Sequence, residues 1–373
     1  MKNETQGIDY ALLVVVMLLV FTGVMMVFSS SFYYAMAKWE NKYLFLEKHL
    51  VWAGAGVVAM IFFSLIDYKL YRKIAFILFV LSFIFLGLLF TPLGKEVNGA
   101  VRWVDIGPLT FMPSEFAKMA AILYMAGFLE NRQRKIHKFS SGLLPVLIIV
   151  GAYFVLIYKQ PNLSNAITIS GILMAMAFVA GVNIFQLMTL GAAGGVGIYA
   201  AILSSEWRAR RFLTFLDPFK DTFGDGWQVI QSLYALGSGG LFGVGLGQST
   251  LNKLYIPEPQ NDFIFATVGE ELGFVGSSLL ILLFLFLIYR CIRIAMNAPD
   301  QYGMFLATGI TAMLAIHTII NVAVVTSSMP VTGLQLPFIS YGGNFLLMLM
   351  IAMGIMLNIS KQSKSIQTKQ RES

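Results

Sequence analysis

Asp262 is the acidic residue whose surroundings most favour chemistry, because it directly precedes an apolar run that leads to Glu270. Burial at the edge of an apolar phase makes a carboxylate hold its proton more tightly unless a cation offsets it, and a general base is tuned in this way. If the segment is helical, Asp262 and Glu270 lie within about a quarter-turn of one face. Asp is also a good helix N-cap, so position alone leaves both roles open for Asp262.

Three neighbouring arginines, Arg208, Arg210 and Arg211, are suited to binding phosphate. A guanidinium fork matches two phosphate oxygens at once. The simpler interpretation is that these long side chains reach toward lipid headgroups. Both interpretations place the arginines at a membrane surface.

A second basic group surrounds Lys118, which follows Glu115 by three residues. At this spacing the two side chains share a helix face and can form an ion pair, and Pro113 suits the first turn of that helix. Arg102 and Trp103 lie a short distance before it. The pair could cap the helix, or Lys118 could meet the phosphate of a lipid-linked substrate.

Residue spacing disfavours other kinds of site. The glycines within 226–247 form neither a dinucleotide-binding motif nor a P-loop. Their density indicates close backbone approach or a re-entrant turn, with small-residue helix packing as the alternative. The histidines His49, His137 and His317 lack the spacing of a zinc enzyme, and Cys291 as the single cysteine excludes an intrachain disulfide.

The composition assigns the chain to the membrane proteins. Of its 373 residues 57% are apolar and 12% are charged, whereas a soluble domain carries roughly 25% charged residues. The net charge of +7 does not require nucleic acid as a partner, because Lys and Arg gather in the cytoplasmic loops of membrane proteins.

The apolar segments predict an all-α polytopic membrane protein with about ten transmembrane helices. Each segment approaches the roughly 20 residues that span a bilayer. The predicted spans are residues 10–31, 50–66, 74–91, 113–129, 143–158, 166–182, 184–203, 274–295, 303–326 and 345–359.

The basic residues of the short loops predict the orientation. They are concentrated on the side that carries both ends of the chain, which makes both termini cytoplasmic. The long connection 204–273, between spans 7 and 8, is then extracytoplasmic and too long to be an idle link. The polar tail 361–373 is expected to be disordered.

The chain resembles the SEDS (shape, elongation, division, sporulation) family, which includes FtsW and RodA, over essentially its whole length. The stretches that begin at Asn98 and Tyr255 are more similar to the division (FtsW) or sporulation branch than to the elongation branch. The motifs that carry the resemblance are residues 98–103, 113–118, 231–235, 237–243, 262–266, 270–273 and 336–343.

The resemblance implies a single SEDS transmembrane domain over 1–373 in the bacterial cell membrane. It implies a peptidoglycan glycosyltransferase that polymerises lipid II, an undecaprenyl-diphosphate-linked disaccharide-pentapeptide. It also implies a class B penicillin-binding protein as partner, beside other divisome or elongasome proteins and membrane lipids. Asp262 matches the family's essential aspartate, and Trp103 matches a required tryptophan.

Three asparagines depart from the family pattern. Asn162 replaces the usual Asp, Asn261 the usual Thr before the key aspartate, and Asn344 the usual Ser. Because Asp262, Trp103 and the basic residues remain, we expect a working enzyme.

The expected reaction inverts the sugar's α-linked anomeric centre, so one base suffices. Asp262 would take the proton of the acceptor 4-hydroxyl, and preorganised cations would stabilise the leaving diphosphate. Mg²⁺ or Mn²⁺ would share that charge. The substrate-binding residues expected are Arg102, Trp103, Glu115, Lys118, Arg208, Arg210, Arg211 and Glu270.

Two other functions remain open. A lipid II flippase would need a polar path through the bilayer, and the main polar residues within the spans are His317 and Asn321. An inactive scaffold that recruits a transpeptidase would tolerate the departures at Asn162 and Asn344. The grouping of charged residues on one side favours chemistry.

Overall fold

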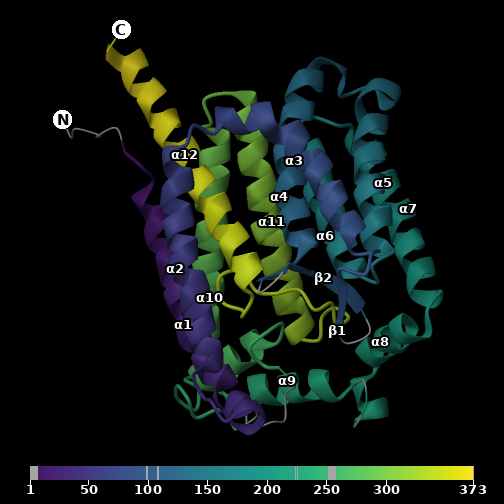
Figure 1. Ribbon diagram of the computed structural model, residues 1–373, viewed down its shortest axis with the longest axis vertical. Helices are drawn as coiled ribbons and strands as arrows, with labels where there is room; N and C mark the ends of the chain where they lie inside the picture. The colour runs from purple at the N-terminus through teal and green to yellow at the C-terminus, as the bar shows by residue number, and fades with distance from the viewer. Residues whose placement is uncertain are drawn as a thin grey trace.

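The computed structural model describes residues 7–97, 100–106, 109–222, 224, 226–250 and 258–372. Its long helices stand side by side in one bundle (Figure 1). The first turn of α1 (Tyr10–Trp39) and the last turn of α12 (Gly343–Glu372) lie at the same end (Figure 1). The opposite end, called the distal end below, carries a small sheet and two short helices.

Each predicted span coincides with a helix. Among the described residues, eight helical segments are long and apolar enough to cross a membrane. The other two predicted spans do not meet these criteria. Helix α6 is shorter, and α4 carries the charged residues Glu115, Lys118, Glu130 and Arg132. Besides α1 and α12, the helices are α2 (Leu44–Leu65), α3 (Lys69–Leu88), α4 (Pro113–Arg132), α5 (Leu144–Tyr158, after a π-helical turn at Phe139–Leu143), α6 (Leu163–Val179), α7 (Ile184–Leu203), α10 (Ile264–Met296) and α11 (Gln301–Val325).

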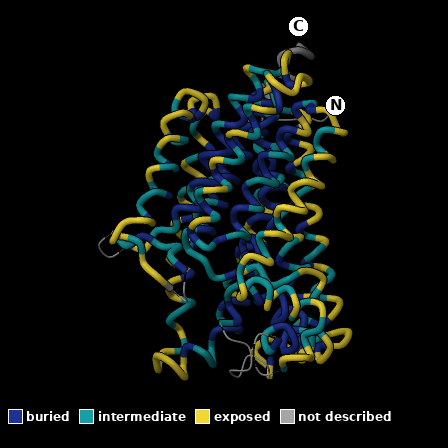
Figure 2. Tube along the Cα trace, turned by 90° about the vertical axis from the view of Figure 1, so that its right-hand side faces the viewer, coloured by how far each residue is buried: buried dark blue, intermediate teal, exposed yellow. Residues whose placement is uncertain are grey.

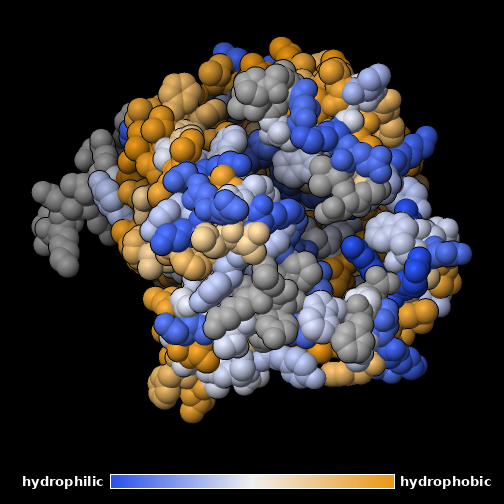
Figure 3. All heavy atoms as spheres, turned by 60° about the horizontal axis from the view of Figure 1, so that its bottom comes forward, coloured by the Kyte–Doolittle hydropathy of each residue, from blue (hydrophilic) through white to orange (hydrophobic). Residues whose placement is uncertain are grey.

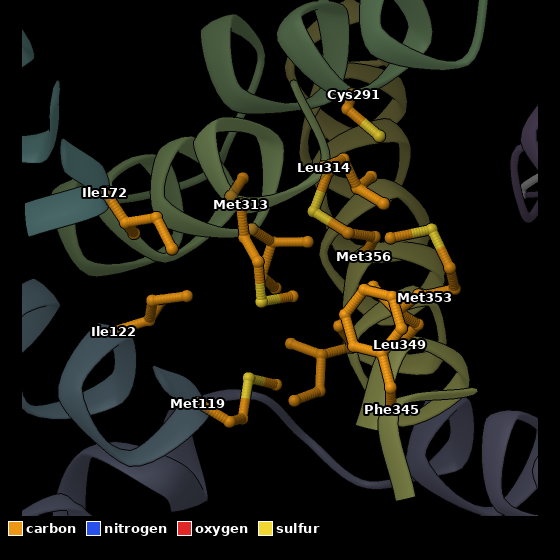
Figure 4. Close-up of a cluster of buried hydrophobic side chains, with 14 of the residues drawn as sticks. Met119, Ile122, Ile172, Cys291, Met313, Leu314, Phe345, Leu349, Met353 and Met356 are labelled. Atoms are coloured by element: carbon orange, nitrogen blue, oxygen red, sulfur yellow. The ribbon is translucent and has the colours of Figure 1, made fainter. Parts of the chain in front are cut away.

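The helices α4, α11 and α12 form the interior of the bundle. Helix α12 packs along α2, and α11 packs against α4, α6 and α10. Buried residues gather along the middle of the trace and exposed ones along its outer edges (Figure 2). Met119, Met313, Met353 and Phe345 meet in this interior (Figure 4). Large apolar side chains also cover the outside, because lipid replaces water there.

The connection 204–273 is largely helical. It holds α8 (Glu206–Leu216), a 3₁₀ turn (Pro218–Asp221) and α9 (Trp227–Ser238). Helix α10 already begins at Ile264 and bends at Gly273 (φ 67°, ψ −166°), directly before the predicted span 274–295. A Cβ on Gly243 would lie 2.1 Å from the carbonyl oxygen of Glu271, so the predicted close backbone approach is confirmed.

A three-stranded antiparallel sheet was not predicted. It comprises β1 (Gly94–Val97), β2 (Ala100–Ile106) and β3 (Leu109–Phe111), in the order β1-β2-β3. The strands are short, so they show little alternation of apolar and polar residues. Strand β2 carries Arg102 and Trp103 to the distal end, where hydrophilic residues gather (Figure 3).

Helix α12 is bounded by Gly343 and Glu372. The disorder expected for the tail 361–373 stays a prediction.

Candidate active site

A cavity of about 830 Å³ lies at the distal end of the bundle. Residues from α1, β2, α4, α6, α8, α9, α11 and α12 line it, together with the segment 258–262 before α10 and the loop 331–335. Segments far apart in the sequence therefore meet around one space. Its polar lining consists of Tyr34, Arg102, Trp103, Glu115, Asn165, Trp207, Arg211, Gln228, Glu258, Asn261, Asp262, His317, Thr332 and Gln335.

Asp262 lies half-buried in the wall of this cavity. The N-cap of α10 is Phe263, without a side-chain capping bond, so the capping role that the sequence left open for Asp262 is wrong. Among the described residues, the Asp262 carboxylate has no hydrogen-bond partner outside its own residue. The carboxylate is therefore available to a substrate.

The electrostatic surroundings of Asp262 suit a base. Burial raises the pKa of Asp262 from 3.8 to about 6, and the negative charge of Glu258 adds to the rise. Arg211 and Arg102 act in the opposite direction and lower it. The group is thus ionised at neutral pH, yet it is a stronger base than an exposed carboxylate.

Two of the four predicted arginines, Arg102 and Arg211, line the same cavity as Asp262. Arg102 donates to the carbonyl oxygen of Pro161 at 3.2 Å, and its buried Nε has no partner among the described residues. Burial and the nearby charge of Arg211 lower the pKa of Arg102. Neither Arg102 nor Arg211 forms an ion pair within the part of the chain that is described. The cavity therefore offers positive charge to an anion.

The other two arginines point elsewhere. Arg208 donates to the hydroxyl of Tyr158 and to the carbonyl oxygen of Ala201, both at 2.8 Å. It therefore ties α8 to α5 and α7. Arg210 is exposed and does not line the cavity. Spacing alone could not separate these residues, because the orientation of α8 depends on its contacts with other helices.

The predicted ion pair between Glu115 and Lys118 is confirmed, and it is buried. The Lys118 Nζ lies 2.9 Å from the Glu115 carboxylate, and only 1% of the Lys118 side chain is exposed. Lys118 Nζ also lies 3.0 Å from His317 Nε2. Glu115 and His317 line the cavity, whereas Lys118 lies behind them. Its charge is largely neutralised by Glu115.

Glu270 lies outside the cavity. It is buried, and its carboxylate accepts from the backbone N–H and hydroxyl of Thr250 at 2.9 Å each, and from Ser249. It thereby secures the end of the glycine-rich stretch. Trp103, in contrast, lies in the cavity wall, as expected of a residue that contacts the substrate.

The sequence model of the cell cycle protein family FtsW/RodA/SpoVE matches residues 9–365. The chain belongs to this family.

Relatives from the FtsW/RodA/SpoVE family cover nearly the whole chain. Stage V sporulation protein E of Bacillus subtilis (strain 168) is 44% identical over 98% of this chain and 100% of its own. A probable peptidoglycan glycosyltransferase FtsW of Trichlorobacter lovleyi is 40% identical over 94% of this chain and 93% of its own. These identities agree with the resemblance to the division and sporulation branch.

Solved structures share the fold. One, described as "Structural coordination of polymerization and crosslinking by a peptidoglycan synthase complex", has a TM-score of 0.79 and 27% identity, covering 95% of this chain and 98% of that one. The rod shape determining protein RodA of Thermus thermophilus has a TM-score of 0.71 and 26% identity, covering 97% and 99%. The polytopic membrane fold is therefore that of RodA.

Two departures from the FtsW/RodA/SpoVE pattern have structural explanations. Asn162 is the N-cap of α6 and accepts from the backbone N–H of Asn165 at 3.3 Å. Asn caps a helix about as well as Asp. Asn344 donates to the carbonyl oxygen of Thr110 at 3.0 Å, which links α12 to β3. Neither asparagine disturbs Asp262.

Sequence reasoning did not select Glu258 or the loop 331–335. Glu258 has left-handed backbone (φ 46°) and accepts from Asn261 Nδ2 at 2.7 Å and from the Tyr34 hydroxyl at 3.4 Å. The sequence feature that could have indicated Glu258 is its position four residues before Asp262 in the same motif. The loop 331–335 carries no charge, so its residue types gave no signal. Residues 251–257, which include Tyr255, lie outside the described residues.

Proposed function

We propose that this protein is a peptidoglycan glycosyltransferase that polymerises lipid II into glycan strands during division or sporulation. The observation that carries the proposal is the cavity in which a half-buried Asp262 faces two arginines without acidic partners among the described residues. The names of the FtsW relatives support the reaction.

Asp262 acts as the general base. It removes the proton from the 4-hydroxyl of the acceptor sugar while that oxygen attacks the anomeric carbon of the donor. The bond from this carbon to the diphosphate breaks, and its electron pair leaves with undecaprenyl diphosphate. Arg102 and Arg211 stabilise the growing negative charge, because they are fixed in place before the reaction begins. Trp103 and Glu115 contact the sugars.

Mg²⁺ or Mn²⁺ would supply further positive charge to the diphosphate. The described residues contain no group of three or more His, Cys, Asp or Glu side chains that could hold a metal ion. Mg²⁺ usually binds through one or two carboxylates together with substrate phosphates, and Glu258 in the cavity wall fits this requirement.

The distal end faces the outside of the cell, with both termini cytoplasmic, as the basic loops predict. Lipid II then meets the cavity from the outer leaflet. The partner is a class B penicillin-binding protein that cross-links the new strands. The similar structure described as a peptidoglycan synthase complex supports such an assembly.

The rate of strand synthesis should fall as the pH drops through about 6, because Asp262 then takes up a proton and loses its function as base. Well below this value the loss should be about tenfold per pH unit. The measurement is kcat/KM for lipid II against pH in detergent. Glu258→Gln should move the midpoint to lower pH, because it removes a negative neighbour. A flat profile through this range would argue against Asp262 as base.

Arg211→Gln should lower kcat/KM for lipid II by about 10- to 100-fold, since it removes one of two cations that face the leaving group. Arg210→Gln on the same helix is the matched control and should retain nearly full activity, because Arg210 lies outside the cavity. Equal losses in both variants would mean that the arginines act on the membrane surface and not on the diphosphate.

A further inference from the structure

We infer that His317 and Asn321 of α11 are positioning residues. Asn321 fixes the backbone of the base Asp262, and His317 fixes the buried ammonium group of Lys118. The inference rests on the proposed function, since it assigns Asp262 as the base. His317 and Asn321 are four residues apart, so they lie on one face of the helix. Each is only 1% exposed. Both reach toward the cavity wall from within the bundle.

Asn321 joins the backbone of Asp262 to the loop 331–335. Its Nδ2 donates to the carbonyl oxygen of Asp262 at 2.7 Å and to that of Leu334 at 2.8 Å. A side-chain amide has two N–H donors, and both are used here. Loop and base are therefore fixed by one nitrogen. The neighbouring Gly333 brings the loop close to the carboxylate, because a Cβ added at Gly333 would lie 3.7 Å from Asp262 Oδ2.

One helical turn before Asn321, His317 connects Lys118 to the loop 331–335. Lys118 Nζ can only donate, so His317 Nε2, 3.0 Å away, must accept. The proton of the neutral ring is then on Nδ1, which faces the carbonyl oxygen of Gln335 at 3.4 Å. Phe345 packs against the ring at 4.7 Å between centroids. His317 thus fixes both the ammonium group of Lys118 and the loop.

Further hydrogen bonds connect the loop 331–335 to the chain segment that precedes Asp262. Gln335 Nε2 donates to the carbonyl oxygen of Tyr341 at 2.9 Å. The backbone N–H of Tyr341 donates to the carbonyl oxygen of Gln260 at 2.8 Å, two residues before Asp262. The base is therefore held from both sides of its loop. A displacement of a catalytic group by about 1 Å can reduce the rate about 100-fold. Loss of these hydrogen bonds should therefore lower the turnover rate.

The test compares four single variants by strand synthesis from lipid II and by hydrogen exchange of the whole protein in detergent. His317→Phe keeps a flat ring without nitrogens, and Asn321→Leu keeps the approximate shape without donors. His317→Gln retains an acceptor for Lys118 and a donor for Gln335. Thr318→Val is the matched control, because the buried Thr318 hydroxyl donates, among the described residues, only to the carbonyl oxygen of Leu314 in its own helix.

His317→Phe and Asn321→Leu should lower kcat about 10- to 100-fold, with KM for lipid II changed less than about threefold. Backbone exchange should rise in 258–263 and 331–341. His317→Gln should restore most of the activity, and Thr318→Val should equal the wild type. Unchanged kcat and exchange in the first two variants, or an equal loss in Thr318→Val, would overturn the inference. If the wild type makes no strands, the proposed function fails, and the exchange data alone decide the inference.

Discussion

Replacing Asp262 with asparagine should reduce strand synthesis about 10³-fold without loss of folding. The amide is nearly isosteric but cannot accept the proton of the acceptor hydroxyl. Because the pKa of Asp262 is raised to about 6 by burial, the charged carboxylate opposes folding at neutral pH, and its removal should not lower thermal stability. The measurements are lipid II polymerisation and the melting temperature in detergent.

Glu206→Gln is the control for the Asp262 substitution. Glu206 is an exposed acid at the distal end that does not line the cavity, so the same chemical change there should leave activity intact. If purified Asp262→Asn polymerised lipid II at the wild-type rate, Asp262 would not be the general base.

Replacing Lys118 with methionine should destabilise the protein by about 3–5 kcal/mol, because it leaves the Glu115 carboxylate buried without its ion pair. His317 Nε2 also loses its donor. The change should appear as a large drop in melting temperature and in the yield of monodisperse protein. Arg72→Gln provides the comparison. Its pair with Glu130 is about half exposed on the arginine side, so that loss should be at most about 1 kcal/mol.

A double variant separates the ion pair from other effects at this position. Glu115→Gln combined with Lys118→Met removes both charges, so at least half of the lost stability should return. A double variant whose loss equals the sum of the single losses would mean that the two side chains do not interact.

The sequence was sufficient to predict the bundle, because most of the predicted spans are strongly apolar and long enough to cross a bilayer. It also predicted the pair of Glu115 and Lys118 and the start of α4 at Pro113, since these depend on local helical geometry. Asp262 could be selected because an acid directly before an apolar run is costly to bury.

Other parts of the site depend on long-range packing. The Arg208 side chain contacts Tyr158, 50 residues away, and the partner of Glu270 lies 20 residues earlier in the chain. No spacing rule connects such residues. The loop 331–335 contributes carbonyl oxygens through its backbone, and those do not depend on residue type. His317 and Asn321 appeared in the sequence only as polar residues within a span.

The most direct test gives lipid II to the purified wild-type protein and to Asp262→Asn in detergent, where there is no second compartment. The account predicts glycan strands and free undecaprenyl diphosphate from the wild type only. Strands from both proteins would contradict Asp262 as the base. A wild type that makes no strands but moves lipid II across vesicles would identify a flippase, and one that does neither but still binds a transpeptidase would identify a scaffold.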